Sequence, residues 1–182
     1  MTINKALKTA SLAHKGQFRK GGKIPYILHP MEAGVIAASL TMKDNKVDEE
    51  VIAAAILHDV IEDTDLTYQD LSDQFNEKVL NLIRLQSEDK SRTWQERKEA
   101  TIDLLKNNQD INFEIVTLSD KLSNLRSIHK DYQILGESLW KRFNVKEKSS
   151  HKWYYTSIAK EIKKLKDTRE YKEYKELLEV FN

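Results

Sequence analysis

The chain has 182 residues, of which 40% are hydrophobic and 32% charged, and its 30 Lys and Arg against 29 Asp and Glu give a net charge of +1. This length suits one domain with a sizeable core, and the balanced charge gives no reason to expect a nucleic-acid or membrane partner. Cysteine is absent, which excludes disulfides and thiolate metal sites, so any metal ligands must be His, Asp or Glu. No apolar run resembles a signal peptide or a membrane span, and we therefore expect a soluble cytoplasmic protein.

Apolar residues recur at steps of three and four along most of the chain, which is typical of amphipathic helices. Five Gly and two Pro are too few for an all-β chain with many tight turns. The sequence therefore predicts a single all-α domain over residues 1–182. Helices are expected over 3–14, 30–40, 48–63, 67–75, a stretch capped by Asn76, 94–106, 113–126, 147–165 and 171–181.

The predicted helix 48–63 combines a core-like middle with a polar end. Asp48 is suited to cap it, and small aliphatic residues follow. Its end carries four ionisable residues: His58, Asp59, Glu62 and Asp63. In one helix these side chains share one broad face. Buried charge is costly unless it is paired or binds a metal, and imidazole with carboxylates suits a hydrolytic divalent metal. The alternative is a solvated acidic helix end.

Residues 16–25 contain three glycines and a proline and are expected to form a loop. The loop and its flank carry four cations: Lys15, Arg19, Lys20 and Lys23. Cations on a flexible backbone can form the rim of a phosphate or nucleotide site, although an ordinary surface loop can carry them too. His29 follows, beside Pro30, which favours a first helical turn and lets the imidazole point inward. A single histidine there is more often a cap or a core residue than a ligand.

The predicted helix 113–126 places an acid beside its buried face. A core-facing stripe is formed by Ile115, Leu118, Leu122 and Leu125. Asp120 and Asn124, four residues apart, share the face next to this stripe. The alternative for Asp120 is an ordinary boundary residue that pairs with Lys121 or Lys130.

Two features lie further along the chain. Residues 136–144 interrupt the helical pattern, and Arg142 and Lys146 form a basic pair beside this break. The aromatic residues at 153–155 are expected to pack in the core, as aromatic stripes at helical spacing usually do.

Together, these residues predict a metal site. His29, His58, Asp59 and Asp120 come from three predicted helices, and each has an apolar flank that orients it inward. Two imidazoles and two carboxylates suit Mn²⁺, Fe²⁺ or Zn²⁺ with water in the remaining positions. Such a metal generates hydroxide near neutral pH, which predicts a metal-dependent phosphohydrolase.

Further residues fit this chemistry. Glu62 and Asp63 lie one turn beyond the predicted ligands, where they can move protons or orient the attacking water. Arg19 and Lys20, with the pair Arg142 and Lys146, supply positive charge for an anionic substrate.

Four segments carry a resemblance to a known family. The order of His29, His58-Asp59 and Asp120 resembles the HD superfamily of metal phosphohydrolases, whose fold is a helical bundle. More narrowly, the segments resemble the hydrolase domain of the RelA/SpoT family, and the match covers roughly residues 3–130. The later residues 140–144 and 153–155 are similar to those of stand-alone small alarmone hydrolases. The segments are 14–21, 25–30, 58–64 and 118–126, so the hydrolase motifs span 14–126, and C-terminal helices are expected over 146–180.

The resemblance implies an activity, a cofactor and roles for particular residues. The activity is removal of the 3′-pyrophosphate from guanosine 3′,5′-bis(diphosphate) or its pentaphosphate form, giving GDP or GTP, with one Mn²⁺ per chain. Glu62 and Asp63 would be the catalytic acids. The metal ligands would be His29, His58, Asp59 and Asp120. Substrate would be bound by Arg19 and Lys20 at the guanine and by Asn124 at the ribose. Beyond the resemblance, we expect the basic pair Arg142 and Lys146 to contact phosphates.

Three departures from the family pattern are visible. Ser119 stands where the family usually has Ala, which should be harmless. Trp94 occupies a region where some relatives have a basic residue, so part of the phosphate clamp is expected to differ. The chain leaves no room for a synthetase domain, and synthesis is not expected.

Other functions remain open. An HD-type enzyme acting on NADPH or a deoxynucleotide would share the fold and the metal site. A non-catalytic nucleotide-binding module would be expected to lack a ligand or the acids Glu62 and Asp63, and a purely structural bundle would bind no metal. A homo-oligomer is also left open.

Overall fold

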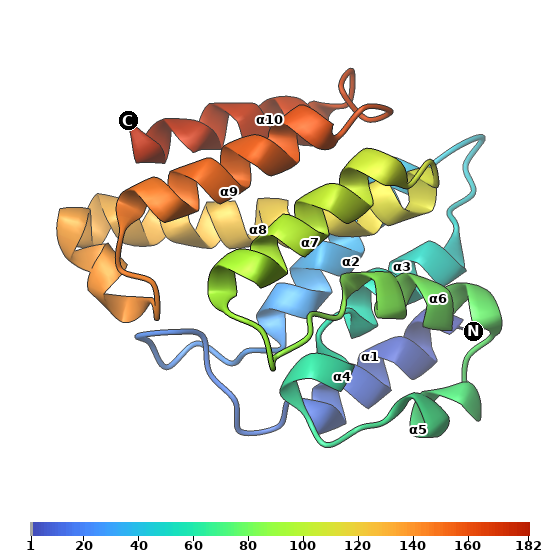
Figure 1. Cartoon of the computed structure of the whole chain (residues 1–182). Helices are drawn as coiled ribbons and strands as arrows, with labels where there is room; N and C mark the ends of the chain where they lie inside the picture. The colour runs from blue at the N-terminus through green and yellow to red at the C-terminus, as the bar shows by residue number, and fades with distance from the viewer. Residues whose placement is uncertain (1) are drawn as a thin grey trace.

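The computed structural model describes residues 2–182 and is built from helices (Figure 1). Besides these helices, residues 2–182 contain two isolated β-bridges and no strand, which confirms the predicted all-α domain. Within the same range, no helix combines the length and apolar character that crossing a bilayer requires. The helical elements are α1 (Thr2–Ala13), α2 (Leu28–Thr41), α3 (Glu49–Leu57), α4 (Val60–Asp63), α5 (Tyr68–Ser72), α6 (Glu77–Gln86), α7 (Trp94–Asn107), α8 (Ile111–Leu135), η1 (Gly136–Arg142), α9 (Lys148–Glu161), α10 (Arg169–Leu177) and η2 (Leu178–Phe181).

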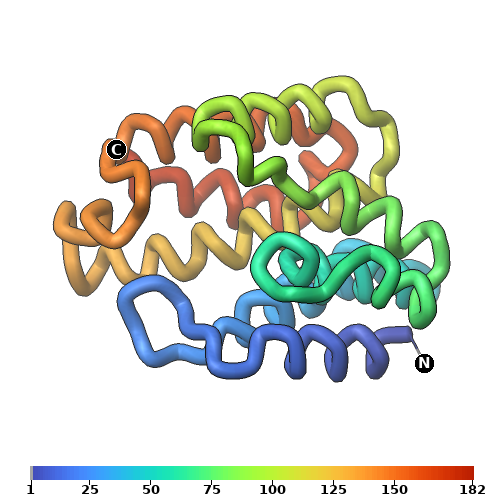
Figure 2. The backbone as a smooth tube through the Cα atoms, turned by 60° about the horizontal axis from the view of Figure 1, so that its bottom comes forward, coloured from blue at the N-terminus to red at the C-terminus, as the bar shows by residue number. Residues whose placement is uncertain are grey.

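Helix α8 runs through the middle of the molecule between two groups of helices (Figures 1 and 2). On one side α8 contacts α2, α3 and α6, and α1 packs against α3. On the other side α8 contacts α10, while α9 packs against α7 and η2. Asp120, near the middle of α8, can therefore meet residues from helices that are distant in the sequence.

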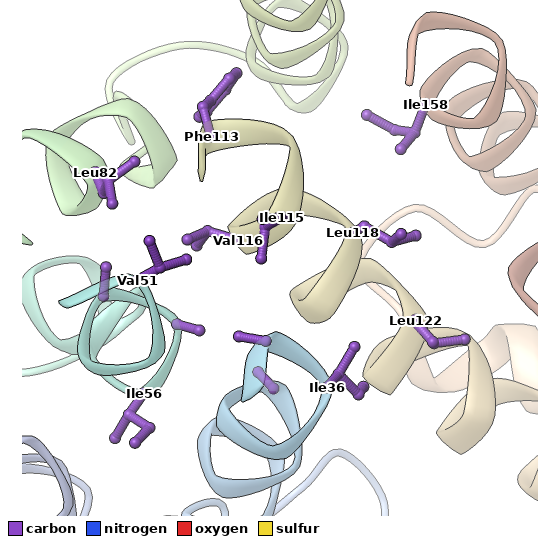
Figure 3. Packing of buried hydrophobic residues seen from close by; sticks show 14 of the residues in the cluster. Ile36, Val51, Ile56, Leu82, Phe113, Ile115, Val116, Leu118, Leu122 and Ile158 are labelled. Atoms are coloured by element: carbon purple, nitrogen blue, oxygen red, sulfur yellow. The ribbon is translucent and has the colours of Figure 1, made fainter. Parts of the chain in front are cut away.

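The hydrophobic core surrounds α8 (Figure 3). Val116 of α8 faces Val51 of α3 and Leu82 of α6, while Ile158 of α9 approaches Leu118 from the other group of helices. All four residues of the predicted stripe are buried: Ile115, Leu118, Leu122 and Leu125. Full burial of one such side chain stabilises the fold by about 1.5–3 kcal/mol, so α8 is held rigidly in place.

Polar caps fix several helix starts. The Asp48 side chain accepts from the backbone N–H groups of Glu50 and Val51 at 3.1 and 3.2 Å, which confirms it as the N-cap of α3. Thr67 and Asp70 form a capping box at the start of α5, and Asn76 caps α6 as predicted. Thr93 caps α7 with a second capping box that the sequence analysis missed.

The prediction of one continuous helix over 48–63 is wrong. Helix α3 ends at Leu57, His58 and Asp59 form a turn, and α4 is a single short turn that begins at Val60. The imidazole Nδ1 of His58 lies 2.7 Å from the carbonyl oxygen of Ala55, one of the last-turn carbonyls that need a partner where a helix ends. The buried His58 thus replaces a backbone contact of the helix with a side-chain contact.

Other helix ends differ from the predictions. The helix predicted over 147–165 ends at Glu161, because the next turn is redirected by Glu114 of α8. The buried Glu114 carboxylate accepts from the backbone N–H groups of Lys163 and Lys164 at 3.1 and 2.9 Å. Three further differences are the end of α5 at Ser72, the extension of α8 to Leu135 and the 3₁₀ turn η2 after Leu177.

Candidate active site

A cavity of about 850 Å³ lies between the two groups of helices. Its lining comes from the loop after α1, the start of α2, the segment from the end of α3 through α4, the end of α6, the loop before α7 and the start of α7. Helix α8, η1 with the residues that follow it, and α9 complete the lining. Ten of the predicted site residues line it: Arg19, Lys20, His29, His58, Asp59, Glu62, Asp63, Asp120, Asn124 and Arg142. Lys146 is exposed and does not line the cavity.

The carboxylates of Asp59 and Asp120 both approach the Nε2 atoms of His29 and His58. The Nε2 atoms of His29 and His58 lie 3.2 Å apart. Asp59 Oδ2 lies 3.0 Å from His58 Nε2 and 3.5 Å from His29 Nε2. Asp120 Oδ1 lies 3.4 Å from His29 Nε2 and 3.5 Å from His58 Nε2. Both imidazoles and Asp120 are buried, whereas the Asp59 side chain is 17% exposed.

Hydrogen bonds behind the two imidazoles orient them. His58 Nδ1 faces the Ala55 carbonyl at 2.7 Å, so this nitrogen carries the proton of the neutral ring. His29 Nδ1 lies 2.8 Å from the Ser123 hydroxyl oxygen. With protons on both Nδ1 atoms, two nitrogen lone pairs and two carboxylate oxygens face one another. Four acceptors at this spacing repel unless a cation lies among them, which fits a divalent metal ion.

The charges of this cluster shift its pKa values. Burial opposes the imidazolium form of His58, but the carboxylates of Asp59 and Asp120 outweigh it and raise the pKa of His58 well above its usual value. Burial also opposes ionisation of both carboxyl groups. The charge on His58 nevertheless holds the pKa of Asp59 well below the usual range, and the charges on Lys121 and His58 do the same for the pKa of Asp120. The carboxylates therefore attract a cation, which can be a proton on His58 or a metal ion.

Tyr26 lies against the same cluster. Its phenol donates a hydrogen bond to Asp59 Oδ2, and burial beside the Asp59 carboxylate raises the pKa of Tyr26. The neutral phenol thus holds Asp59 in place without adding charge. Nothing in the residue pattern around Tyr26 indicated this role.

Glu62 and Asp63 lie on α4, next to the cluster. Glu62 Oε2 accepts from the backbone N–H of Glu88 at 3.3 Å, and Arg97 Nη1 lies 3.9 Å from Glu62 Oε1. Burial raises the pKa of Glu62, and the carboxylates of Glu88, Asp59 and Asp63 add to this shift. Asp63 is more exposed and pairs with Lys90 Nζ at 2.8 Å. The two neighbouring acids therefore have different environments.

A second part of the cavity lining carries the predicted nucleotide contacts. Arg19 Nη2 donates to Asn124 Oδ1 at 3.0 Å, and Asn124 Nδ2 donates to Asp120 Oδ1 at 2.6 Å. The Arg19 guanidinium also lies 5.8 Å from the centre of the Tyr26 ring. Lys20 Nζ lies 5.5 Å from the centre of the Phe143 ring, and burial together with the charge of Lys98 lowers the pKa of Lys20. Arg19 thus connects this part of the lining to the histidine-aspartate cluster.

Gly21 brings the loop close to Arg142. The backbone of Gly21 has φ +74°, and a Cβ atom there would lie 2.5 Å from Cδ and Nε of the Arg142 side chain. Arg142 Nη1 lies 3.4 Å from Asp131 Oδ2. Only glycine allows Arg142 this position at the cavity rim.

A second charged group in the cavity was not predicted from the sequence. Glu88 accepts from Arg97 Nη1 at 3.0 Å and from Lys98 Nζ at 2.6 Å, and all three residues line the cavity. Glu88 belongs to residues 87–92, a segment whose polar composition predicts an exposed loop. The spacing of charges in this segment contains no signal that Glu88 turns inward.

Asp120 forms the ion pair expected of a boundary residue and also faces the two imidazoles. Its Oδ1 atom faces the two imidazoles, while its Oδ2 atom forms an ion pair with Lys121. Lys121 is also held over the Tyr154 ring, with Nζ 5.7 Å from the ring centre. The ion pair with Lys121 therefore does not exclude a ligand role for Asp120.

The chain is similar to known proteins over most of its length. A family model described as HD domain matches residues 6–140. The bifunctional (p)ppGpp synthase/hydrolase SpoT of Escherichia coli K12 is 35% identical over 131 residues, which are 69% of this chain and 18% of SpoT. The chain thus spans less than a fifth of that relative. The guanosine-3′,5′-bis(diphosphate) 3′-pyrophosphohydrolase MESH1 of Drosophila melanogaster is 36% identical over 123 residues, 67% of this chain and 66% of MESH1.

Solved structures show the same fold. A metazoan ortholog of SpoT, described as hydrolysing ppGpp, superposes with a TM-score of 0.79 at 25% identity and covers 98% of this chain and 94% of its own. The lmo0812 protein of Listeria monocytogenes EGD-e superposes with a TM-score of 0.72 at 28% identity, over 83% of this chain and 96% of its own. These matches confirm the resemblance carried by the four motif segments. The chain belongs to the HD-domain family.

Proposed function

We propose that this protein is a divalent-metal-dependent pyrophosphohydrolase that acts on guanosine 3′,5′-bis(diphosphate) and its pentaphosphate form. It removes the 3′-pyrophosphate and leaves GDP or GTP. The observation that carries the proposal is the convergence of His29, His58, Asp59 and Asp120 beside two acids in a cation-lined cavity. Relatives named for this reaction, among them MESH1, support the choice of substrate.

His29, His58, Asp59 and Asp120 would hold one metal ion, for which we propose Mn²⁺. All-N/O ligand sets with carboxylates suit this ion. When bound, such an ion makes water more acidic and polarises a phosphoryl oxygen. The chain contributes the fixed geometry, because hydrogen bonds behind both imidazoles and Asp59 hold these side chains in place.

Glu62 is the better placed of the two acids to accept the proton of the attacking water. Its raised pKa brings it nearer to neutrality, which suits a general base. Asp63, paired with Lys90, would orient the water or the 3′-pyrophosphate. Arg97, close to both Glu62 and Glu88, supplies positive charge beside this end of the cavity.

The nucleotide would lie along the part of the cavity lining that Arg19, Lys20 and Asn124 form. Arg19 and Lys20 would contact the guanine, since a planar guanidinium can stack on a base. Asn124, bonded to both Arg19 and Asp120, would reach the ribose between the base and the metal. Arg142 would contact phosphate, whereas Lys146 lies outside the cavity lining, and the proposed phosphate contact is therefore limited to Arg142.

Metal affinity should depend on pH. Asp59 and Asp120 raise the pKa of His58, so below that raised pKa the metal-free protein carries a proton that must leave when the metal binds. We expect the affinity for Mn²⁺ to increase with pH by up to about tenfold per unit over this range. Calorimetric titration between about pH 6 and 8 measures this slope. His129→Asn removes a histidine outside the cavity lining and should show the same pH dependence of Mn²⁺ affinity. In the unsubstituted chain, a Mn²⁺ affinity that does not change with pH would contradict the proposed role of His58.

Gly21→Ala should weaken substrate binding by displacing Arg142. Losing one charge-assisted contact costs about 1.5–3 kcal/mol, so we expect KM to rise by about tenfold or more. Gly16→Ala is the matched control, because Gly16 also has a positive φ of +81° but its added Cβ would meet no atom within 4 Å. Both variants strain the backbone, but only Gly21→Ala adds a clash with Arg142, so the difference between their KM values measures the effect of that clash. Equal KM values in the two variants would exclude a role for Arg142 in binding.

The choice of substrate is tested by comparing kcat/KM for the alarmone, NADPH and deoxynucleotides in Mn²⁺. We expect the highest value for the alarmone. A much higher value for NADPH or a deoxynucleotide would leave the metal site in place but assign the enzyme to another substrate. A non-catalytic nucleotide-binding module would bind the alarmone without turning it over.

A further inference from the structure

A chain of hydrogen bonds connects His29 to the C-terminal helix α10. His29 Nδ1 lies 2.8 Å from the Ser123 hydroxyl oxygen, and this hydroxyl donates to Glu32 Oε2 at 2.8 Å. Arg126 Nη1 donates to Glu32 Oε1 at 3.0 Å. Arg126 also forms two hydrogen bonds with the Glu173 carboxylate of α10, at 2.6 and 2.7 Å. Helices α2, α8 and α10 thus meet behind one proposed metal ligand.

The order of donors in this chain fixes the state of His29. An ionised carboxylate only accepts hydrogen bonds, so the Ser123 proton must point to Glu32. The Ser123 oxygen is then free to accept, and its partner is the Nδ1–H of His29. This arrangement places the proton of the neutral imidazole on Nδ1 and leaves the Nε2 lone pair facing His58, Asp59 and Asp120.

Both imidazoles carry the proton on Nδ1, but different groups accept the hydrogen bond from it. His58 donates from Nδ1 to the carbonyl oxygen of Ala55, a backbone atom fixed by α3. His29 depends on two side chains, Ser123 and Glu32. The ring of His29 is therefore held in place by residues that substitution can remove without changing the backbone.

We propose that Glu32 and Ser123 are positioning residues that hold His29 in its metal-binding orientation, with the Nε2 atom directed at the proposed metal site. The proposal rests on the metal site of the proposed function. A carboxylate that accepts a hydrogen bond from the distal nitrogen of a ligating imidazole is a recurring feature of metal sites. Here the carboxylate acts through the buried hydroxyl of Ser123.

Arg126 and Glu173 fix the Glu32 carboxylate. The side chain of Glu32 is 38% exposed and would otherwise be free to turn toward water. Arg126 holds it from α8, and Glu173 holds Arg126 from α10 through two parallel hydrogen bonds, a geometry with high directional specificity. The C-terminal helix thereby contributes to the geometry of the site, although α10 provides no residue to the cavity lining.

The test is the affinity of the metal-stripped full chain for Mn²⁺, measured by calorimetric titration without substrate. Loss of a partner behind a metal ligand typically costs about 10–100-fold in metal affinity. We expect a loss of this size for Ser123→Ala and a loss for Glu32→Gln that is smaller but measurable, because the amide can still accept from Ser123. Ser123→Thr retains the hydroxyl and should therefore bind Mn²⁺ about as tightly as the unsubstituted chain.

Ser119→Ala provides the matched control. Ser119 is also a buried serine of α8, one turn before Ser123, but its hydroxyl donates only to the carbonyl of Ile115, at 2.7 Å, within the same helix. We expect Mn²⁺ affinity to stay within about threefold of the unsubstituted chain, well below the loss expected for Ser123→Ala. Thermal melting of all variants monitors folding.

Two results would overturn the proposal. One is a Ser123→Ala variant that binds Mn²⁺ as tightly as the unsubstituted chain, and the other is an equal loss of affinity in Ser119→Ala. Neither result depends on the alarmone. An unsubstituted chain that binds Mn²⁺ but leaves the alarmone intact would contradict the proposed function and leave the role of Ser123 and Glu32 standing.

Discussion

Asp59→Ala is expected to abolish Mn²⁺ binding and to lower alarmone turnover by at least about two orders of magnitude. Asp59 Oδ2 is the atom that approaches both imidazoles, at 3.0 and 3.5 Å, and Tyr26 holds it there. Its removal leaves two lone pairs and the single carboxylate of Asp120 to attract the ion. Turnover assays over a range of Mn²⁺ concentrations, together with calorimetric titration, measure both effects.

Asp48→Ala is the matched control for this variant. Asp48 lies at the other end of α3 and caps it, so its loss should cost about 1 kcal/mol of stability without changing metal binding. Thermal melting measures the loss of stability, and the same calorimetric titration measures any loss of Mn²⁺ binding. Asp59→Ala with unchanged metal affinity and turnover would show that the site is misplaced.

Glu62→Gln is expected to lower kcat by at least about two orders of magnitude while Mn²⁺ affinity is retained. The amide preserves the size of the side chain and its contact with the backbone of Glu88 but cannot accept the proton of water. General base catalysis contributes about 10²–10⁴-fold, which sets the expected loss. Comparing kcat with metal affinity in the same preparation separates loss of the base from loss of the metal.

The pH profile gives a second signature of Glu62. Burial and neighbouring carboxylates raise its pKa, so the basic form is lost as the pH falls through this raised value. The acidic limb of kcat should therefore lie at a higher pH than an ordinary glutamate would give, and it should be absent in Glu62→Gln. A Glu62→Gln variant that keeps the kcat and the pH profile of the unsubstituted chain would assign the base to another residue, such as Asp63.

The helical fold could be predicted because its signals are local. Apolar residues at steps of three and four define most helices, and the caps Asp48, Thr67 and Asn76 bond to their own first turns. The break between α3 and α4 could not be predicted in this way. It depends on the buried contact of His58 with Ala55 and on Asp59 facing residues of other helices, and neither is visible in the spacing along the chain.

The histidines and aspartates at the centre of the site could be predicted from the sequence, whereas the charged residues around them could not. An aspartate or histidine beside a buried helical face calls for a partner, which is why His29 and Asp120 stood out. Glu88 lies in a polar segment and gave no such signal, although it binds both Arg97 and Lys98 in the cavity. Glu88 lies in a loop while Arg97 and Lys98 lie on α7, so the spacing along the chain does not show that these three side chains meet.

The most direct test of the proposed activity is a Mn²⁺-titrated hydrolysis assay with guanosine 3′,5′-bis(diphosphate) that identifies the phosphate product. We expect turnover that requires the metal, with pyrophosphate and GDP released in equal amounts. Release of single phosphate, or no turnover at any Mn²⁺ concentration in a chain shown to bind the ion, would contradict the proposed reaction.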